Sequence, residues 1–430
     1  MASDYALSYD PPRAVEHNAL PVLSFVALLL LIFVGLDAFS PPPIMQAGAA
    51  AQASHGDAMR QLAYLSVAGM IGIAAVQRFG FGALRALPVG MGLLLAWCLA
   101  SALWAPDPNI VLRRAGLEII LVGSLLLSVE TLGANKAFTL WRWLLAAILL
   151  VNFLSIPLMP IARHPAGEID PALAGNWRGL YGHKNVAGAV SAMTAILFLF
   201  TKNGWRNVIG IAIAAAACLF LVMTHSKSSA GFFVIALIGG MLYRVCWRDG
   251  LSRAVLVAFA ALLLIAATVL GFLYAEQIAR LLQDPNEFTG RAAIWAAELR
   301  YIADHPLLGA GFGTLTDAQS QSPLHSYISG WAGAVSHGHN GYLQILVTVG
   351  GVGFMLAMLA LLLAPARRLW TLDLDEDGFK PMLFSLFVFA LLHNVMESDF
   401  LEGDSLVWAS LVLVIGALNA RARRHSLTGR

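Results

Sequence analysis

The chain has 430 residues, of which 59% are hydrophobic and only 12% are charged, and its mean hydropathy is +0.73. A soluble protein carries about 25% charged residues, so this chain has too little polar surface to cover a water-soluble body. The composition therefore excludes a soluble enzyme and indicates one polytopic membrane domain. The net charge of +2 is too small to indicate nucleic-acid binding.

Apolar stretches long enough to cross a bilayer occur along the whole chain. A membrane-spanning helix needs roughly 20 mostly apolar residues, and about twelve segments qualify. They are residues 19–38, 61–78, 86–104, 114–132, 138–159, 184–201, 206–224, 230–247, 254–274, 339–363, 382–397 and 405–420. The runs lack the alternation of barrel strands, so we expect an all-α membrane protein. Very short turns at Lys202 and His225 predict that the helices flanking each turn are antiparallel neighbours.

The N-terminus does not have the pattern of a secretory signal. Residues 1–20 contain Asp4, Asp10 and Glu16 against a single Arg13, and the following apolar run is long enough to span the membrane. We therefore expect this run to be the first span. Cleavage after it, within the alanine-rich residues 49–53, is the alternative.

Basic residues in the connecting segments predict the orientation. With an even number of spans, both termini lie on one side, and that side receives most of the 27 Lys and Arg residues, including Arg421, Arg423 and Arg424. We therefore expect both termini in the cytoplasm. The chain then divides into nine spans with an outer loop near 160–183 (residues 1–274), a large outer loop with catalytic elements (275–338), and three spans with a basic tail (339–430).

Several cations fall on the outer side, where the positive-inside rule disfavours them. Arg178, His183, Lys184 and Asn185 stand together at the start of the span 184–201. We expect Asn185 to cap this helix and its free N–H groups, with Lys184, to form an anion site. A plain helix start with a snorkelling lysine is the alternative. Lys227, in the polar turn 224–229, is either a further substrate-binding cation or part of a turn with hydroxyl caps.

The large outer loop contains a predicted helix that begins near Arg291, with Thr289 or Asn286 as its cap. A cation in the first turn of a helix is electrostatically unfavourable, which indicates a partner anion. That anion is either a substrate or a local carboxylate such as Glu287. Residues 305–313 then form a helix stop and a glycine-rich turn, which is not a dinucleotide site because no βαβ unit surrounds it.

Two further motifs lie where the chain meets the membrane. The first is His337-Gly338-His339-Asn340, and an imidazole at this boundary is expected to be functional. The second is His393-Asn394-x-x-Glu397-Ser398-Asp399, at the end of the eleventh span. Ionisable groups there mark a functional interior, unless Glu397 is simply solvated at the interface.

No metal site is expected. The i, i+2 spacing of His337 and His339 does not place both rings on one helical face, and the Glu168-Ile-Asp170 pattern is weak on its own. The three cysteines lack metal-ligand spacing, and we expect them to pack as small apolar residues: Cys98, Cys218 and Cys246.

Taken together, these motifs resemble the O-antigen ligase and polymerase family of bacterial envelope proteins, and most closely its exopolysaccharide-polymerase branch. The resemblance extends from about residue 104 to residue 400. It rests on Trp104-Ala105-x-Asp107-Pro108, Arg178-Gly179-x-x-Gly182-His183-Lys184-Asn185-x-x-Gly188, Ser226-Lys227-Ser228-Ser229, Thr289-Gly290-Arg291-x-x-x-Trp295, His305-Pro306-Leu307-Leu308-Gly309, His339-Asn340-x9-Gly350-x-x-Gly353 and Glu397-Ser398. The element that begins at His339 is the most specific.

The resemblance implies an all-helical glycosyltransferase of the GT-C type in the bacterial inner membrane, with a periplasmic active site. It implies an undecaprenyl-diphosphate-linked glycan donor, a glycan acceptor, a polysaccharide export machinery as a partner, and neither cofactor nor metal. His339 matches the catalytic base, and Arg291 and Arg178 match the arginines that hold the donor diphosphate. The residues expected to bind substrate are His183, Lys184, Asn185, Lys227, His337, Asn340 and Glu397.

The chemistry agrees with these roles, because guanidinium groups stabilise the charge that develops on a leaving diphosphate. One base on one face predicts inversion at the anomeric carbon. The Lys184-Asn185 and Glu397-Ser398 patterns favour a polymerase over a ligase that joins the glycan to lipid A-core. A secondary transporter would show two similar halves with ionisable residues at the midplane, which this sequence lacks. A scaffolding membrane protein would tolerate loss of the polar loop residues.

Overall fold

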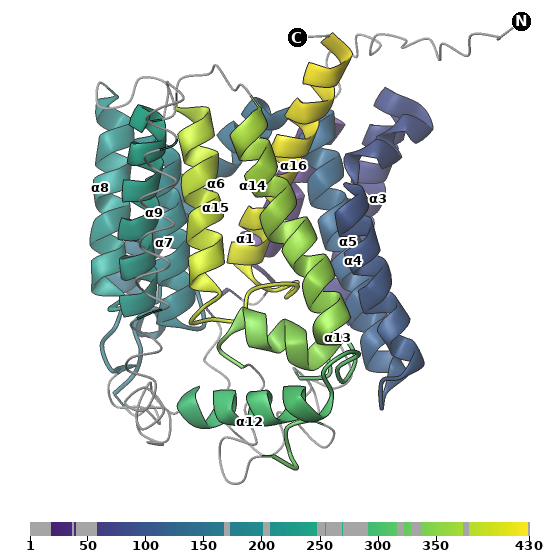
Figure 1. Cartoon of the computed structure of the whole chain (residues 1–430). Coiled ribbons are helices and arrows are strands. Elements are labelled where there is room, and N and C mark those ends of the chain that lie inside the picture. Colours follow the sequence, from purple (N-terminus) through teal and green to yellow (C-terminus); the bar gives the residue numbers. More distant parts are fainter. Residues whose placement is uncertain are drawn as a thin grey trace, which may run out of the picture.

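The computed structural model of the chain consists of α-helices joined by short segments (Figure 1). It describes residues 19–36, 38–39, 58–166, 173–200, 207–246, 254, 269, 291–315, 322–327, 338–372 and 378–428. In these ranges there is no β-strand, and one isolated bridge joins Arg163 to Trp177. The predicted all-α class is therefore confirmed.

Most helices run along a common bundle. They are α1 (Leu20–Phe33), α3 (Ala58–Phe79), α4 (Val89–Ala100), α5 (Pro108–Leu132), α6 (Ala134–Leu158), α7 (Lys184–Leu199), α8 (Val208–Met223), α9 (Lys227–Cys246), α13 (Gly341–Ala357), α14 (Ala364–Thr371), α15 (Phe379–His393) and α16 (Leu406–Thr428). A π-helical turn at Met358–Leu363 joins α13 to α14. Each predicted span coincides with a helix, except 254–274, which lies almost entirely outside the described residues.

Five helical stretches within the described residues are long and apolar enough to cross a membrane. They are Ala58–Ala86, Ala134–Leu158, Lys227–Val245, Gly341–Thr371 and Leu406–Arg423. Several shorter helices are also apolar. The chain is therefore a polytopic membrane protein, while the number of twelve crossings stays a prediction.

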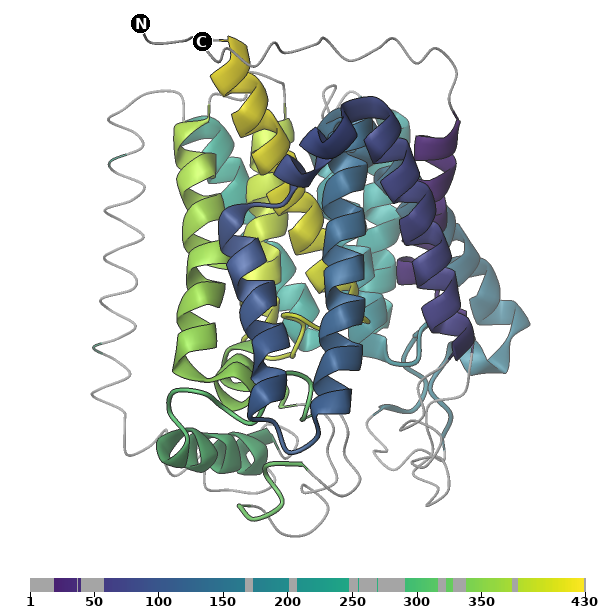
Figure 2. The same ribbon diagram turned by 90° about the vertical axis from the view of Figure 1, so that its right-hand side faces the viewer.

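The last helix, α16, runs through the middle of the bundle (Figure 2). It packs against α5, α15, α14 and α7, and 83% of its apolar window is buried inside the protein. A helix that is apolar on every face needs such complete enclosure. The outer helices instead expose large apolar side chains such as Leu23, Leu62 and Leu150, a surface suited to lipid.

The α7–α9 segment folds back on itself as the short turns predicted. α7 packs along α8, and α9 packs against α7, α8 and α15 (Figure 1). At the other side of the bundle, Asp107 caps α5 by accepting a hydrogen bond from the Asn109 N–H at 2.9 Å, and Pro108 follows as the first helical residue. Trp104 Nε1 donates to the Leu308 carbonyl at 3.2 Å, so the 104–108 motif has a structural role.

The two ends of the bundle differ. α1 begins and α16 ends at one end, whereas α12 (Arg291–Asp304) lies across the opposite end (Figures 1 and 2). The starts of α7 and α13 and the end of α15 also lie at this opposite end, which we call the α12 end (Figure 1). The fold thus gathers there the motifs that begin or end these helices.

The predicted span 339–363 is not one continuous helix. It breaks at Gly350, where φ is 67° and ψ is −173°. The segment 306–311 enters the break: the Gly351 N–H donates to the Pro306 carbonyl at 2.8 Å, and the Gly311 N–H donates to the Thr348 carbonyl at 2.7 Å. Backbone groups freed by the break are therefore paired again, as an apolar environment requires.

Gly350→Ala should destabilise the protein strongly. Strained backbone of this kind costs about 1–3 kcal/mol for a residue with a side chain. A Cβ would also overlap the Leu307 carbonyl. We expect an apparent Tm several degrees below wild type in detergent. Gly72→Ala is the matched control, because a Cβ at Gly72 meets no atom within 4 Å. Equal Tm values for the two variants would contradict this role of the break.

Candidate active site

Glu397 lies at the centre of a polar cluster at the α12 end. It follows the end of α15, and its carboxylate receives hydrogen bonds from three segments that are distant in sequence. Asn185 Nδ2 donates to Oε1 at 2.7 Å, Arg291 Nη2 donates to Oε1 at 3.0 Å, and His339 Nδ1 lies 3.2 Å from Oε2. Four residues predicted to act at the site are thus in direct contact.

Glu397 is ionised in this setting. Burial raises the pKa of Glu397, but the hydrogen bond with His339 and the charges of Arg291 and His339 outweigh burial and lower that pKa to about 2. The alternative of a merely solvated interfacial carboxylate does not describe it, because 16% of the side chain is exposed and its oxygens have partners. Glu397 is therefore a fixed anion that orients the groups around it.

His339 stands in the turn that begins α13. Its φ of 52° is in the left-handed region, and Asn340 caps the helix by accepting from the N–H groups of Tyr342 and Leu343, both at 3.0 Å. The segment after α15 holds the same turn, because the Asn340 N–H donates to Ser398 Oγ at 3.1 Å. Asn340 is thus a positioning residue, and the strained turn aims the His339 ring at Glu397.

This geometry assigns the tautomer of His339. An ionised carboxylate accepts and does not donate, so Nδ1 carries a proton, and in the neutral form of the ring the lone pair lies on Nε2. Nε2 makes no hydrogen bond among the described residues, and His339 lines a cavity of about 360 Å³ with Asn185, His393 and Glu397. His339, whose Nε2 holds the lone pair in the neutral ring, therefore lines a cavity large enough for a ligand.

Arg291 is the first residue of α12, and its position predicted a partner anion. The structure shows that this anion is Glu397. Besides Glu397, it donates through Nη1 to the carbonyl of Met396. The partner is the distant Glu397, while Glu287, Thr289 and Asn286 lie outside the described residues. The guanidinium thus fixes α12 to the segment after α15.

α12 also supports the turn that carries His339. Trp295 Nε1 donates to the Gly338 carbonyl at 2.9 Å. A Cβ at Gly338 would overlap Oε1 of Glu298, whose carboxyl is fully buried and has no hydrogen-bond partner among the described residues. Burial raises the pKa of Glu298 well above its usual value. A side chain at position 338 would therefore require the Glu298 carboxyl to move.

Arg178 is placed differently from the expectation of direct contact with a diphosphate. It is 1% exposed, and it donates from Nε to the Ile161 carbonyl at 2.8 Å and from Nη1 to the Gly182 carbonyl at 3.0 Å. It thereby holds the loop that leads to His183. A catalytic role for Arg178 stays a prediction, and in this conformation its contacts are those of a positioning residue.

The predicted cap of α7 was wrong. His183, not Asn185, is the N-cap, and its Nδ1 accepts from the Asn185 N–H at 3.2 Å. The Asn185 side chain is instead committed to Glu397. Burial lowers the pKa of His183 to about 4, with a further lowering by the nearby His164. His183 is therefore neutral, as an acceptor at a helix start must be.

The other predicted binding residues are less central. Lys184 is the first residue of α7, and its backbone N–H donates to His164 Nε2 at 3.1 Å. Lys227 is exposed at the first turn of α9, and no described contact joins it to Glu397. His337, Glu168 and Asp170 lie outside the described residues. Among the described residues, no group of three or more His, Cys, Asp and Glu side chains could hold a metal.

A second buried group of hydrogen-bonded side chains lies beside Glu397, and the sequence analysis did not predict it. It consists of Ser229, His393 and Asp399. His393 Nδ1 lies 2.7 Å from Asp399 Oδ2, and His393 Nε2 lies 3.3 Å from Ser229 Oγ. All three side chains are buried. The motif around Glu397 contained His393 and Asp399, but their pairing required the turn after α15, and Ser229 comes from α9. These hydrogen bonds join α9 to the end of α15, and His393 and Asp399 also line the His339 cavity.

Fold and site together define a class: a polytopic helical membrane protein with an ionised Glu–His–Arg cluster in a cavity at one end of the bundle. Residues 211–358 match the family model described as O-antigen ligase, so the chain carries a domain of this family. The family predicted from the motifs is confirmed, and the exopolysaccharide-polymerase branch stays a prediction. A comparison with curated proteins finds no match.

The matched range contains Lys227, Arg291 and His339 but neither Asn185 nor Glu397. The structure brings these two residues into the cluster from both sides of the family domain. The family supports a membrane enzyme that processes glycans. It therefore favours an enzyme over the transporter and scaffold alternatives.

Proposed function

We propose that this protein transfers or polymerises glycan repeat units from an undecaprenyl-diphosphate-linked donor at the periplasmic face of the inner membrane. A polymerase is the first candidate, and a ligase that joins the glycan to lipid A-core is the second candidate. The observation that carries the proposal is the contact between His339 Nδ1 and the ionised Glu397 beside the cavity, which assigns Nε2 of the neutral ring as the nitrogen that can act as a base.

In the proposed reaction, Nε2 of His339 removes the proton of an acceptor hydroxyl as the hydroxyl oxygen attacks the anomeric carbon. The new glycosidic bond forms while the bond from that carbon to the diphosphate oxygen breaks, and the electron pair leaves with the diphosphate. Attack from the face opposite the leaving group inverts the anomeric centre. The imidazolium formed is stabilised by Glu397, which already contacts its other nitrogen.

Cations around the cluster support the diphosphate part of the proposal. Arg291 at the start of α12 and Lys184 at the start of α7 lie at the same end of the bundle as His339 (Figure 1). In this proposal, they stabilise the negative charge that grows on the leaving oxygens. Arg178 acts through the loop it holds. No step requires a metal or a cofactor.

Arg291→Lys should lower transfer at least about tenfold, although the charge is retained. Arginine bonds both Glu397 and the Met396 carbonyl, whereas the lysine ammonium is a point charge without a planar fork. Loss of one charge-assisted hydrogen bond corresponds to about this factor. The assay is incorporation of labelled repeat units in membrane vesicles. Arg300→Lys, at an exposed position of the same helix, is the control. Equal rates for both variants would contradict the role of Arg291.

Glycan analysis of a deletion strain distinguishes the two candidate functions. For a polymerase, single repeat units should accumulate on the carrier lipid and polymer length should be lost. For a ligase, full-length polymer should accumulate on the carrier and be absent from lipid A-core. Unchanged glycans and unchanged carrier-linked intermediates would contradict both.

A further inference from the structure

His393 and Asp399 close a short loop that carries Glu397. His393 is the last residue of α15, and its Nδ1 lies 2.7 Å from Oδ2 of Asp399, six positions further along the chain. Both side chains are buried. Glu397 lies inside this loop, and its N–H donates to the His393 carbonyl at 2.9 Å. The side-chain contact and this backbone bond together hold the backbone of Glu397.

The His393 ring is fixed by the packing of α9 against α15. Its Nε2 lies 3.3 Å from Ser229 Oγ, which also donates to the Asn185 carbonyl at 3.4 Å. The centre of the ring lies 5.4 Å from that of Phe389 in α15 and 6.5 Å from that of Phe232 in α9. A ring enclosed on several sides keeps one orientation, so Nδ1 stays directed at the loop.

Serine, histidine and aspartate also form the triads of hydrolytic enzymes, but the setting of this group differs. Ser229 is 0% exposed and is not among the residues that line the His339 cavity, whereas His393 and Asp399 line it. A nucleophile must reach its substrate. The geometry therefore assigns these side chains to the orientation of their neighbours.

The loop 393–399 meets the other parts of the site. Its Met396 carbonyl accepts from Arg291 of α12, and its Ser398 hydroxyl accepts from the Asn340 N–H at 3.1 Å. Glu397 stands between these two positions in the chain. The position of the loop therefore decides where the Glu397 carboxylate lies.

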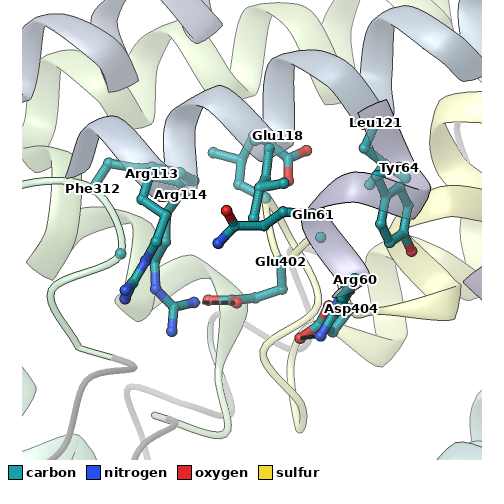
Figure 3. Close-up of a pocket in the computed structure, with 14 residues that line it drawn as sticks. Arg60, Gln61, Tyr64, Arg113, Arg114, Glu118, Leu121, Phe312, Glu402 and Asp404 are labelled. Atoms are coloured by element: carbon teal, nitrogen blue, oxygen red, sulfur yellow. Dashed lines mark hydrogen bonds and ion pairs between the residues drawn. The ribbon is translucent and has the colours of Figure 1, made fainter. Parts of the chain in front are cut away.

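The segment after this loop has anchors of its own. Glu402 accepts from Gln344 Nε2 of α13, and Asp404 contacts both Nη1 and Nη2 of Arg60 in α3 (Figure 3). These contacts border a cavity of about 340 Å³ whose lining includes three arginines: Arg60, Arg113 and Arg114 (Figure 3). Loss of the bond that closes the loop should therefore release the loop alone and leave this end of the bundle folded.

We propose that His393 is a positioning residue for the base of this site. Its contact with Asp399 fixes the loop that carries Glu397, and Glu397 keeps a proton of the His339 ring on Nδ1. This inference rests on the proposed function, because it names the residue that prepares the base of the same site. Ser229 holds the ring of His393 from the other side.

Two amides of different length separate the two contacts of the His393 ring. In His393→Asn, the amide nitrogen takes the place of Nδ1 and can still donate to Asp399. In His393→Gln, the longer side chain places its amide near the former Nε2, beside Ser229, and the contact with Asp399 is lost. The two amides are equally polar, so a difference between the variants reports the contact with Asp399.

The first readout is the tautomer of His339. It is measured by nitrogen NMR of the full-length protein, isotope-labelled in histidine and reconstituted in liposomes, at alkaline pH where imidazole is neutral. Signals absent from His339→Asn belong to His339. We expect the Nδ1–H form in wild type and His393→Asn, and a mixture with the Nε2–H form in His393→Gln. Tyr342→Phe is the control, because it removes a different hydrogen bond at this end, to the Leu391 carbonyl, and should keep the Nδ1–H form.

The second readout is transfer in membrane vesicles. His393→Gln should lower kcat at least about tenfold with KM nearly unchanged, and His393→Asn should stay within about threefold of wild type. In a Glu397→Gln background, His393→Gln should cost no more than about twofold further, because the residue through which it acts is already lost. A merely structural role would give the same factor in both backgrounds.

A pure Nδ1–H form in His393→Gln, or equal loss of transfer in both amide variants, would overturn the inference. If the Tm shows that His393→Gln does not fold, Asp399→Ala removes the same contact and decides in its place. The tautomer is measured without transfer. A tautomer change in a protein that transfers no glycan would therefore contradict only the proposed function, and transfer with an unchanged tautomer only this inference.

Discussion

His339→Asn should lower glycan transfer by at least about 100-fold, which is the lower range for loss of a general base. The structure favours asparagine for this test. Residue 339 has a φ of 52°, and asparagine tolerates the left-handed region better than most residues. The fold should therefore persist while the basic nitrogen is lost.

The measurement is incorporation of labelled repeat units into polymer in membrane vesicles, at matched protein levels and with Tm recorded in detergent. His305→Asn is the matched control. His305 is exposed beyond α12, and its ring stacks on Tyr301 at 4.5 Å, away from the Glu397 cluster. Near-normal polymer from the His339 variant would remove this residue as the base, whatever the rest of the cluster does.

Glu397→Gln should be nearly as damaging, although glutamine has almost the same shape. Glu397 accepts from Asn185, Arg291 and His339, and only an ionised carboxylate can accept from all three. An amide N–H₂ facing His339 would instead donate to Nδ1. The proton would then move to Nε2, and the base would be lost, so we expect a loss of about 100-fold or more by tautomer reversal.

Glu397→Gln should also change how the stability of the fold depends on pH. The folded pKa of Glu397, about 2, lies below its ordinary value of 4.5, so this carboxylate stabilises the fold above pH 4.5. That contribution is lost as the pH falls from 4.5 towards 2. Glu397→Gln should therefore flatten the fall of Tm with acid in this window. An unchanged acid profile, or full activity, would show that the Glu397 contacts do not orient His339.

The amino-acid sequence alone was sufficient to predict the fold class and to identify several residues of the Glu397 cluster. Long apolar runs have one stable solution in a bilayer, because every backbone group must be paired within the segment. The helices therefore follow from composition and run length. His339, Arg291 and Glu397 could be selected because ionisable groups at the membrane boundary are costly without a function.

The contacts among these residues could not be predicted from the sequence. Arg291 and Glu397 are 106 positions apart, and Asn185 and Glu397 are 212 apart. Local signals assigned Asn185 to a helix cap, whereas the packing of α7 against α15 and α16 turned its side chain to Glu397. The break at Gly350 was also hidden, because the partner of its freed backbone groups is the remote segment 306–311.

The cavity lined by Arg60, Arg113 and Arg114 shows the same limit most clearly. In the sequence, Arg60 and the adjacent pair Arg113-Arg114 lie near the ends of two apolar spans, and no local pattern connects Arg60 to the pair. Helix packing brings α3 and α5 together and adds the segment 401–404 from the far end of the chain. Hydrophobic patterning specifies which stretches enter the membrane. Long-range packing specifies which polar ends meet, because that depends on how the buried faces of separate helices fit one another.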